Sequence, residues 1–243
     1  MSGSILPSQL KNAVQRLSDD FGLTPVTAAE LEFYFPVPFT GKELADFPLY
    51  KWEKEKGEGQ YEVALLPAAP EKTVQDLYKI KEILSGMGAD FSARPKADQP
   101  GSGLHIHLHL ENGDSKNVFY KDDARMSDAL AHSIGGLLAS IPASMNVFAP
   151  TADSYKRFVA GANAPMTVSW GANNRTVAIR LPDKPHDKKH IEHRVPGADA
   201  DPLQVMAVIL AAVHDGLTRK LDPGPQIFGD AALPMYKLPR LVA

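Results

Sequence analysis

Residues 104–110 alternate strictly between apolar residues and histidine, with leucine or isoleucine at the even positions and histidine at the odd ones. A period of two residues predicts a β-strand whose two faces differ. The solvent face of an ordinary half-buried strand carries lysine, threonine or serine, whereas imidazole binds metal ions and donates hydrogen bonds to phosphate. The segment therefore predicts a strand that lines a binding site or, in the simpler interpretation, a solvated face that is rich in histidine.

Three further segments, 26–35, 59–67 and 190–195, have the strand pattern and show the same contrast between their faces. If the four strands pair in one sheet, carboxylates and imidazoles line one of its faces, and such a face repels itself unless cations bind to it. Taken alone, each piece is also compatible with a solvated strand face. The four polar faces carry Glu30 and Glu32, Gln60 and Glu62, His105, His107 and His109, and His190, Glu192 and Arg194.

Helical periodicity predicts four helices, at 4–21, 70–87, 126–141 and 203–220. Asp201 and Pro202 are a favourable start for the last helix, as N-cap and first-turn residue, and Pro142 is expected to end the third helix. The other segments are expected to be short strands at 90–94, 166–170 and 175–181, loops at 36–58, 95–103 and 143–164, and a surface tail from residue 223.

Composition limits the classes of function. The chain has 243 residues with a net charge of −3, so it offers no electrostatic basis for binding nucleic acid or an anionic membrane. No apolar run approaches the length of a membrane span, and the N-terminus lacks a signal pattern. There are no cysteines, which excludes disulfides and thiolate metal sites and fits a cytoplasmic protein. Any metal must therefore be held by histidine and carboxylates.

Carboxylates combined with one or two imidazoles suit Mg²⁺ or Mn²⁺. Arginines suit the phosphate and carboxylate groups of substrates, and the C-terminal half supplies Arg157, Arg175, Arg180 and Arg194. The residues alone therefore indicate a divalent metal site at which phosphate groups of a substrate bind.

Six segments, in this order, resemble the catalytic domain of the glutamine synthetase family of ATP-dependent carboxylate–amine ligases, over about residues 25–220. Residues 30–33 resemble the family's E-x-E-F strand, and 59–62 its G-Q-x-E strand, with Glu55 at the place of a further acid. Residues 96–107 resemble its long K-P-x-x-D-x-x-G-S-G-M-H-x-H segment. The remaining matches are S-Y-K-R at 154–157, N-R-T at 174–176 with Arg180, and I-E-H-R at 191–194.

The resemblance implies an α+β fold, with a curved, mostly antiparallel sheet that is backed by helices and has a metal-lined concave face. It also implies roles for the matching residues. Two divalent ions, Mg²⁺ or Mn²⁺, would be held by Glu32, Glu55 and Glu62, and by Glu30, His105 and Glu192. His107 would contact the phosphate of ATP, Gly101, Arg157 and Arg194 would bind the acid substrate, and Arg175 and Arg180 would stabilise the transferred phosphoryl group.

The chain also departs from the family pattern. It is expected to be a single compact catalytic domain over 1–243 without the family's N-terminal β-grasp domain, and hence a monomer or small homo-oligomer, or dependent on a partner chain that replaces that domain. The family's flap reads P-G-x-E-A-P, but residues 160–165 read A-G-A-N-A-P, so Asn163 replaces a glutamate that helps to deprotonate ammonium. His109 and His190 replace a serine and an arginine.

The expected function is therefore an ATP-dependent ligase that joins glutamate or an analogue, through an acyl phosphate, to an amine other than ammonia. The alternative is a non-catalytic paralogue that binds metal and nucleotide in a regulatory or scaffolding role. The six expected metal ligands favour the enzyme, whereas the missing domain and Asn163 favour the paralogue.

Overall fold

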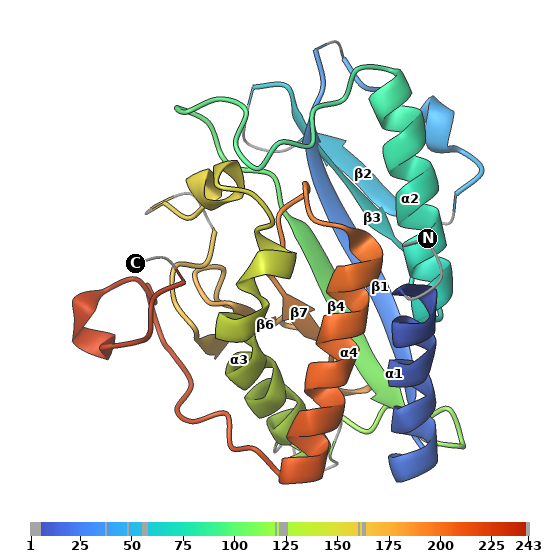
Figure 1. The fold of residues 1–243 in the computed structure, drawn as a ribbon, viewed down its shortest axis with the longest axis vertical. Helices are drawn as coiled ribbons and strands as arrows, with labels where there is room; N and C mark the ends of the chain where they lie inside the picture. The colour runs from blue at the N-terminus through green and yellow to red at the C-terminus, as the bar shows by residue number, and fades with distance from the viewer. Residues whose placement is uncertain are drawn as a thin grey trace.

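The structure is a computed structural model that describes residues 6–36, 38–47, 49–54, 58–119, 121, 126–159, 161 and 164–241. One mixed sheet carries four α-helices on one of its faces (Figure 1). The seven strands lie in the order β2-β3-β1-β4-β7-β6-β5, and only the β5–β6 pair among these described strands is parallel. The expected α+β class with a mostly antiparallel sheet is confirmed. The strands are β1 (Thr24–Tyr34), β2 (Leu49–Lys54), β3 (Gln60–Leu65), β4 (Leu104–Glu111), β5 (Trp170–Ala172), β6 (Ile179–Leu181) and β7 (Ile191–His193).

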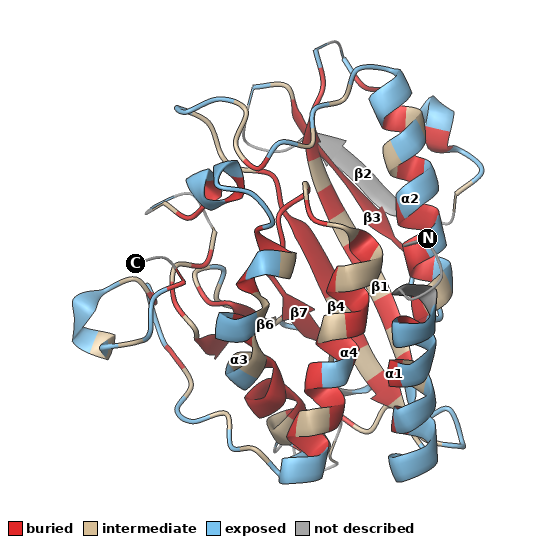
Figure 2. Cartoon of the chain, in the orientation of Figure 1, coloured by how far each residue is buried: buried red, intermediate tan, exposed pale blue. Residues whose placement is uncertain are grey.

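Strands β1 and β4 are neighbours in the middle of the sheet, and the alternation of apolar and polar residues gives each of them two different faces. Leu31 and Phe33 of β1 are fully buried, and so are Leu104 and Ile106 of β4. Figure 2 shows buried residues along both strands. These side chains pack beneath the helices. Burying one such side chain stabilises the folded state by roughly 1.5–3 kcal/mol, because its apolar surface is removed from water. The glutamates and histidines at the alternating positions consequently lie on the face of the sheet that the helices leave uncovered.

The helices are α1 (Leu6–Phe21), α2 (Pro70–Gly86), α3 (Asp128–Phe148) and α4 (Pro202–Arg219). Asp201 caps α4 as predicted, because its side chain accepts a hydrogen bond from the backbone N–H of Gln204. Helices α3 and α4 cross very closely at two glycines. A methyl group on Gly136 would overlap the carbonyl oxygen of Ala212 and lie 2.7 Å from Cα of Gly216. None of the described helices combines the length and apolar character needed to cross a membrane.

The prediction that Pro142 ends the third helix is wrong, since α3 contains Pro142 and continues to Phe148. A proline inside a helix forgoes one backbone hydrogen bond. The residues on either side of it outweigh that loss, because Ile141, Met145 and Phe148 recur at helical spacing and are buried in the core.

The strand predictions need three further corrections. The expected loop at 36–58 contains β2, which forms the edge of the sheet beside β3. The expected strand at 90–94 is reduced to a single bridge between Asp90 and Tyr34. The strands expected at 166–170 and 175–181 are shorter than predicted. The structure has β5 only from Trp170 and β6 only from Ile179.

Candidate metal and phosphate site

The register of four adjacent strands brings the sequence-predicted acids and histidines together. Glu30 of β1 pairs with His105 of β4, and His107 of β4 pairs with Glu192 of β7. Arg180 of β6 pairs with Glu192 from the other side. Residues opposite each other on neighbouring strands have side chains on the same face. The polar side chains of β1, β4, β7 and β6 therefore form one continuous band across the sheet.

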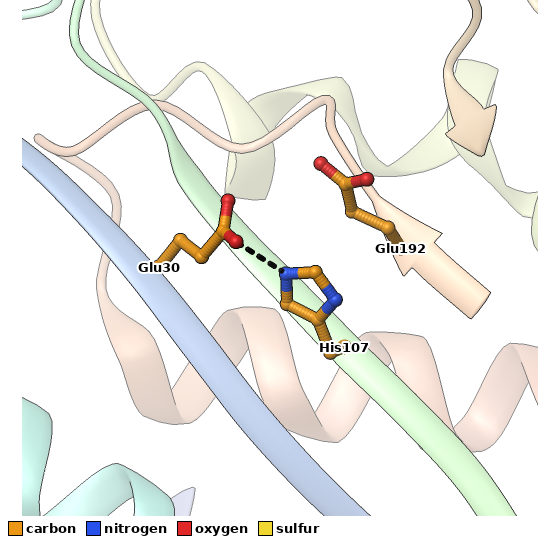
Figure 3. A group of neighbouring side chains, drawn as sticks. All are labelled: Glu30, His107 and Glu192. Atoms are coloured by element: carbon orange, nitrogen blue, oxygen red, sulfur yellow. Dashed lines mark ion pairs between the residues drawn. The ribbon is translucent and has the colours of Figure 1, made fainter. Parts of the chain in front are cut away.

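Three residues in this band form a group that fits a metal ion, namely Glu30, His107 and Glu192 (Figure 3). One ligand atom from each lies within 4.8 Å of those of the other two. Oε1 of Glu30 is 3.4 Å from Nε2 of His107. Two carboxylates and one imidazole, converging from three strands, are a donor set that Mg²⁺ or Mn²⁺ accepts.

His105 faces the same two carboxylates. Its Nδ1 lies 3.4 Å from Oε2 of Glu30 and 3.7 Å from Oε1 of Glu192. The structure thus brings together the three residues expected to share a metal, Glu30, His105 and Glu192. It adds His107, which the family pattern implied for nucleotide phosphate.

Both carboxylates of the group have lowered pKa values. Burial acts to raise the pKa of Glu30, but hydrogen bonds with His105 and His107 outweigh it and hold that pKa well below its usual range. Burial likewise acts to raise the pKa of Glu192, and the Arg194 guanidinium outweighs it, giving a pKa of about 2. Both groups are therefore ionised at neutral pH, as metal ligands must be.

Glu192 is fully buried and accepts hydrogen bonds from two arginines. Nη1 of Arg180 donates to its Oε2 at 2.7 Å, and Nη1 of Arg194 donates to its Oε1. Arg180 is also fixed from the opposite side by Oδ1 of Asn173, at 2.8 Å. A buried carboxylate is tolerated when it is paired in this way, and the pairing holds two guanidinium groups beside the candidate metal ligands.

A second acidic pair lies next to this group. Glu32 of β1 and Glu62 of β3 are directly opposite each other, and Glu62 is buried. The backbone N–H of Gly103 donates to Oε2 of Glu32 at 2.5 Å. Glycine lets these side chains approach the backbone, because a methyl group on Gly103 would lie 2.6 Å from Nε2 of His105 and 2.9 Å from Nη2 of Arg157 and would displace them. Glu55, the third residue expected in this set, lies outside the described residues.

Arg157 and Gly101, both expected to bind the acid substrate, lie against each other. A methyl group on Gly101 would be 2.7 Å from Cβ of Arg157. Arg157 is only 2% exposed, and its Nη1 donates to the carbonyl oxygen of Val195 at 2.5 Å. Burial lowers its pKa to about 10, although Glu32 acts in the opposite direction. The guanidinium therefore stays charged at neutral pH.

Two of the predicted catalytic residues are not placed at the band. Arg175 is exposed in the turn after β5, and within the described part of the chain no hydrogen bond or ion pair joins it to Glu30, His107 or Glu192. Asn163 lies outside the described residues.

A cavity of about 480 Å³ opens beside the band, between the polar face of β1 and β4 and the segment that leads into β7. Its lining includes Glu30, His107 and His109 of the two strands, and Lys184, Asp187 and Lys188 of the segment before β7. These lysines were not predicted as site residues, because residues 182–189 have no strand or helix period. The only available signal was positive charge shortly after Arg180.

The glutamine synthetase catalytic-domain family matches residues 40–237 of this chain. The fold and the band of acids and histidines agree with that match, and the chain belongs to the glutamine synthetase family. The resemblance noted from the sequence motifs is thereby confirmed.

The curated relatives include proteins named gamma-glutamylputrescine synthetase and glutamine synthetase. The chain is 39% identical over 144 residues to the gamma-glutamylputrescine synthetase PuuA of Escherichia coli K12, covering 59% of this chain and 30% of the relative. It is 31% identical over 246 residues to the glutamine synthetase of Thermotoga maritima, covering 85% of this chain and 56% of the relative. The chain thus spans between about a third and somewhat more than half of the length of these relatives.

A solved structure, GmaS in complex with ADP, has the same fold. It superposes with a TM-score of 0.82 over 97% of this chain and 64% of its own, at 24% sequence identity.

Proposed function

We propose that this chain is an ATP-dependent carboxylate–amine ligase that makes an amide through an acyl phosphate, acting on glutamate or an analogue and on an amine other than ammonia. The observation that carries the proposal is the convergence of Glu30, His107 and Glu192 beside Arg180, where Glu30 and His107 also line a cavity. Metal ligands next to a guanidinium are what phosphoryl transfer from ATP requires.

We propose two divalent ions, Mg²⁺ or Mn²⁺, and the group of Glu30, His107 and Glu192 supports the first of them. Glu30, His105 and Glu192 would hold one of them, with His107 within reach of the same carboxylates. Glu32 and Glu62 would hold the other together with Glu55. Bound there, the ions would supply positive charge to the phosphate oxygens of the nucleotide.

The 480 Å³ cavity is the proposed nucleotide site. The phosphates of ATP would lie at its Glu30–His107 end, with the nucleoside toward Leu66 and Pro67. Lys184 and Lys188 line the same cavity and supply positive charge for a nucleotide. That GmaS was solved with ADP supports a nucleotide role for this fold.

The chain's own residues then divide the chemistry between them. Arg157 and Arg194, with the backbone at Gly101, would hold the acid so that its carboxylate oxygen attacks the γ-phosphorus and ADP departs. Arg180, with Arg175, would stabilise the charge that spreads over the transferred phosphoryl oxygens. The amine nitrogen next attacks the acyl carbon, phosphate leaves, and the nitrogen gives up a proton.

The amine is proposed to be larger than ammonia. An enzyme that uses ammonium needs an anionic pocket and a proton acceptor, and the amide of Asn163 provides neither. The name of the PuuA relative, gamma-glutamylputrescine synthetase, supports this choice, since putrescine is a larger amine.

The second candidate is a paralogue that binds metal and nucleotide without turnover. The observations in its favour are Asn163 in the flap segment and the exposed position of Arg175. Monomeric or small-oligomer assembly remains a prediction under either function.

Phosphate release with ATP and Mn²⁺, measured over a panel of acids and amines, tests the proposal. We expect a diamine or another primary amine to release phosphate faster than ammonia, and Asn163→Glu to shift the preference toward ammonia. If the wild type released phosphate as fast with ammonia as with the best amine, the proposal of a larger amine would be contradicted. Nucleotide binding without phosphate release for any pair would favour the paralogue.

A further inference from the structure

Arg157 is a buried cation that needs a counter-charge. Its side chain is 2% exposed, and the partners of its guanidinium are neutral backbone carbonyls, Val195 O at 2.5 Å and Arg194 O at 3.4 Å. Removing a charge from water without an opposite charge nearby is costly. The charged groups that act on Arg157 are the carboxylates of Glu32 and Asp199 and the guanidinium of Arg194.

Asp199 lies in the loop between β7 and α4, held against the segment that carries Arg157. Its Oδ2 accepts a hydrogen bond of 2.5 Å from Ser154, three residues before Arg157 in the η2 turn (Asp153–Arg157). Its other oxygen, Oδ1, is buried and has no hydrogen-bond partner among the described residues. A methyl group on Gly197 would overlap this Oδ1 and lie 3.6 Å from Cδ of Arg157, so the glycine allows the two side chains to approach.

The loop that carries Asp199 is fixed from three directions. The N–H of Gly197 donates to Phe148 O, and the N–H of Ala198 donates to Ser102 O, each at 3.0 Å. Lys81 of α2 donates to Ala198 O at 2.7 Å and also to Ala200 O. Asp199 is therefore set in a rigid frame that includes the Gly101–Gly103 segment of the site.

Glu32 cannot serve as the lasting counter-charge of Arg157 if it also binds a divalent ion, because the ion takes up its charge. Asp199 is outside both proposed ligand sets. Once Glu32 is engaged, Asp199 is the carboxylate left to balance Arg157 among the groups that act on it.

We propose that Asp199 is the positioning residue of Arg157, which it holds oriented toward the carboxylate of the acid substrate through its own charge and its hydrogen bond from Ser154. This role rests on the proposed ligase function and adds a residue to it. Asp199 itself does not touch the acid, the nucleotide or the metals.

Asp199→Asn is the direct test, because asparagine keeps an acceptor for Ser154 and removes only the charge. We expect the KM for the acid to rise at least about tenfold, with the KM for ATP unchanged, and Asp199→Glu to recover part of the loss. The matched control is Asp153→Asn, an exposed acid on the same turn that pairs with Lys156 and should leave both constants unchanged. An acid KM within twofold of wild type in Asp199→Asn would overturn the role.

Two further measurements keep this result separate from the proposed function. Ser154→Ala keeps every charge and loses the hydrogen bond to Asp199 together with two local contacts to Thr151. Its rise in acid KM should therefore be smaller than that of Asp199→Asn. In protein that shows no turnover, hydrogen exchange of the Arg157 Nε–H, followed by NMR, is expected to be faster in Asp199→Asn than in wild type or Asp153→Asn. Unchanged exchange contradicts the positioning role, whereas failure of the wild type to release phosphate counts against the ligase alone.

Discussion

Glu32 and Glu62 occupy directly opposite positions on neighbouring antiparallel strands, β1 and β3. Like charges placed in this way weaken strand pairing, by roughly 0.2–1 kcal/mol for an exposed pair, and Glu62 is buried. This arrangement does not contribute to the stability of the sheet. It is explained if a divalent cation binds between the two carboxylates, which is the first premise of the proposed function.

Removal of one charge should therefore separate metal binding from stability. Glu62→Gln is expected to lose the part of the Mn²⁺ stabilisation that the Glu32–Glu62 site contributes, about 2–3 kcal/mol at a hundredfold excess over the Kd of that site. Without metal, the variant should differ less from the wild type in stability than it does with Mn²⁺ present. Thermal unfolding with and without Mn²⁺ measures both quantities. Glu82→Gln, at an exposed position on α2, is the control and should respond to Mn²⁺ as the wild type does. Equal metal stabilisation in Glu62→Gln would contradict the site.

Arg180 should be essential for phosphoryl transfer. Arg180→Ala removes a guanidinium that lies 2.7 Å from Glu192, and we expect phosphate release to fall by about a hundredfold or more. Arg175→Ala is expected to have the same effect, because the family pattern gives Arg175 the same role. Arg219→Ala, at an exposed position on α4, is the control. Phosphate release near the wild-type rate in either site variant would show that this arginine does not stabilise the transferred phosphoryl group.

The crossing of α3 and α4 gives a prediction about stability alone. Gly136→Ala should lower the free energy of unfolding by several kcal/mol, because its methyl group would overlap the backbone of α4 at Ala212. Gly86→Ala, in α2, meets no atom within 4 Å and should be neutral or raise stability by about 0.5–1 kcal/mol. Urea unfolding compares the two variants. A Gly136→Ala protein as stable as the wild type would show that the helices lie further apart.

Two buried histidines should respond oppositely to the same substitution. His193 is fully buried against Phe148, and neither of its ring nitrogens has a hydrogen-bond partner within the described ranges. His214 is equally buried, but its Nε2 is 2.6 Å from Oδ2 of Asp20. His193→Leu should keep or raise the free energy of unfolding, and His214→Leu should lower it by about 1 kcal/mol or more. The same loss in both would mean that His193 has a partner after all.

The strands of the site were predictable because their alternation is strict. In β1 and β4, the apolar positions are buried and the acids and histidines lie on the other face, as the sequence indicated. The strand order was not predictable. That Glu30 meets Glu192 depends on β4 lying between β1 and β7, and nothing in the local sequence specifies this order.

The errors have local physical causes. Strand β2 was missed because its charged sequence, with Lys51, Glu53 and Lys54, is typical of a loop, and the strand owes its existence to pairing with β3. Helix α3 passes Pro142 because tertiary burial outweighs one lost hydrogen bond. The burial of Arg157 was likewise hidden, since it depends on the loop that follows β7.

The central claim is that a carboxylate oxygen of the acid substrate attacks the γ-phosphate of ATP, and isotope transfer tests it most directly. The acid is supplied with ¹⁸O in its carboxylate, together with ATP, Mn²⁺ and the best amine, and the released phosphate is examined by mass spectrometry. An acyl-phosphate route predicts one ¹⁸O atom in each phosphate formed. Phosphate that carries no ¹⁸O would show that the ATP is hydrolysed by water, and would contradict the ligase mechanism.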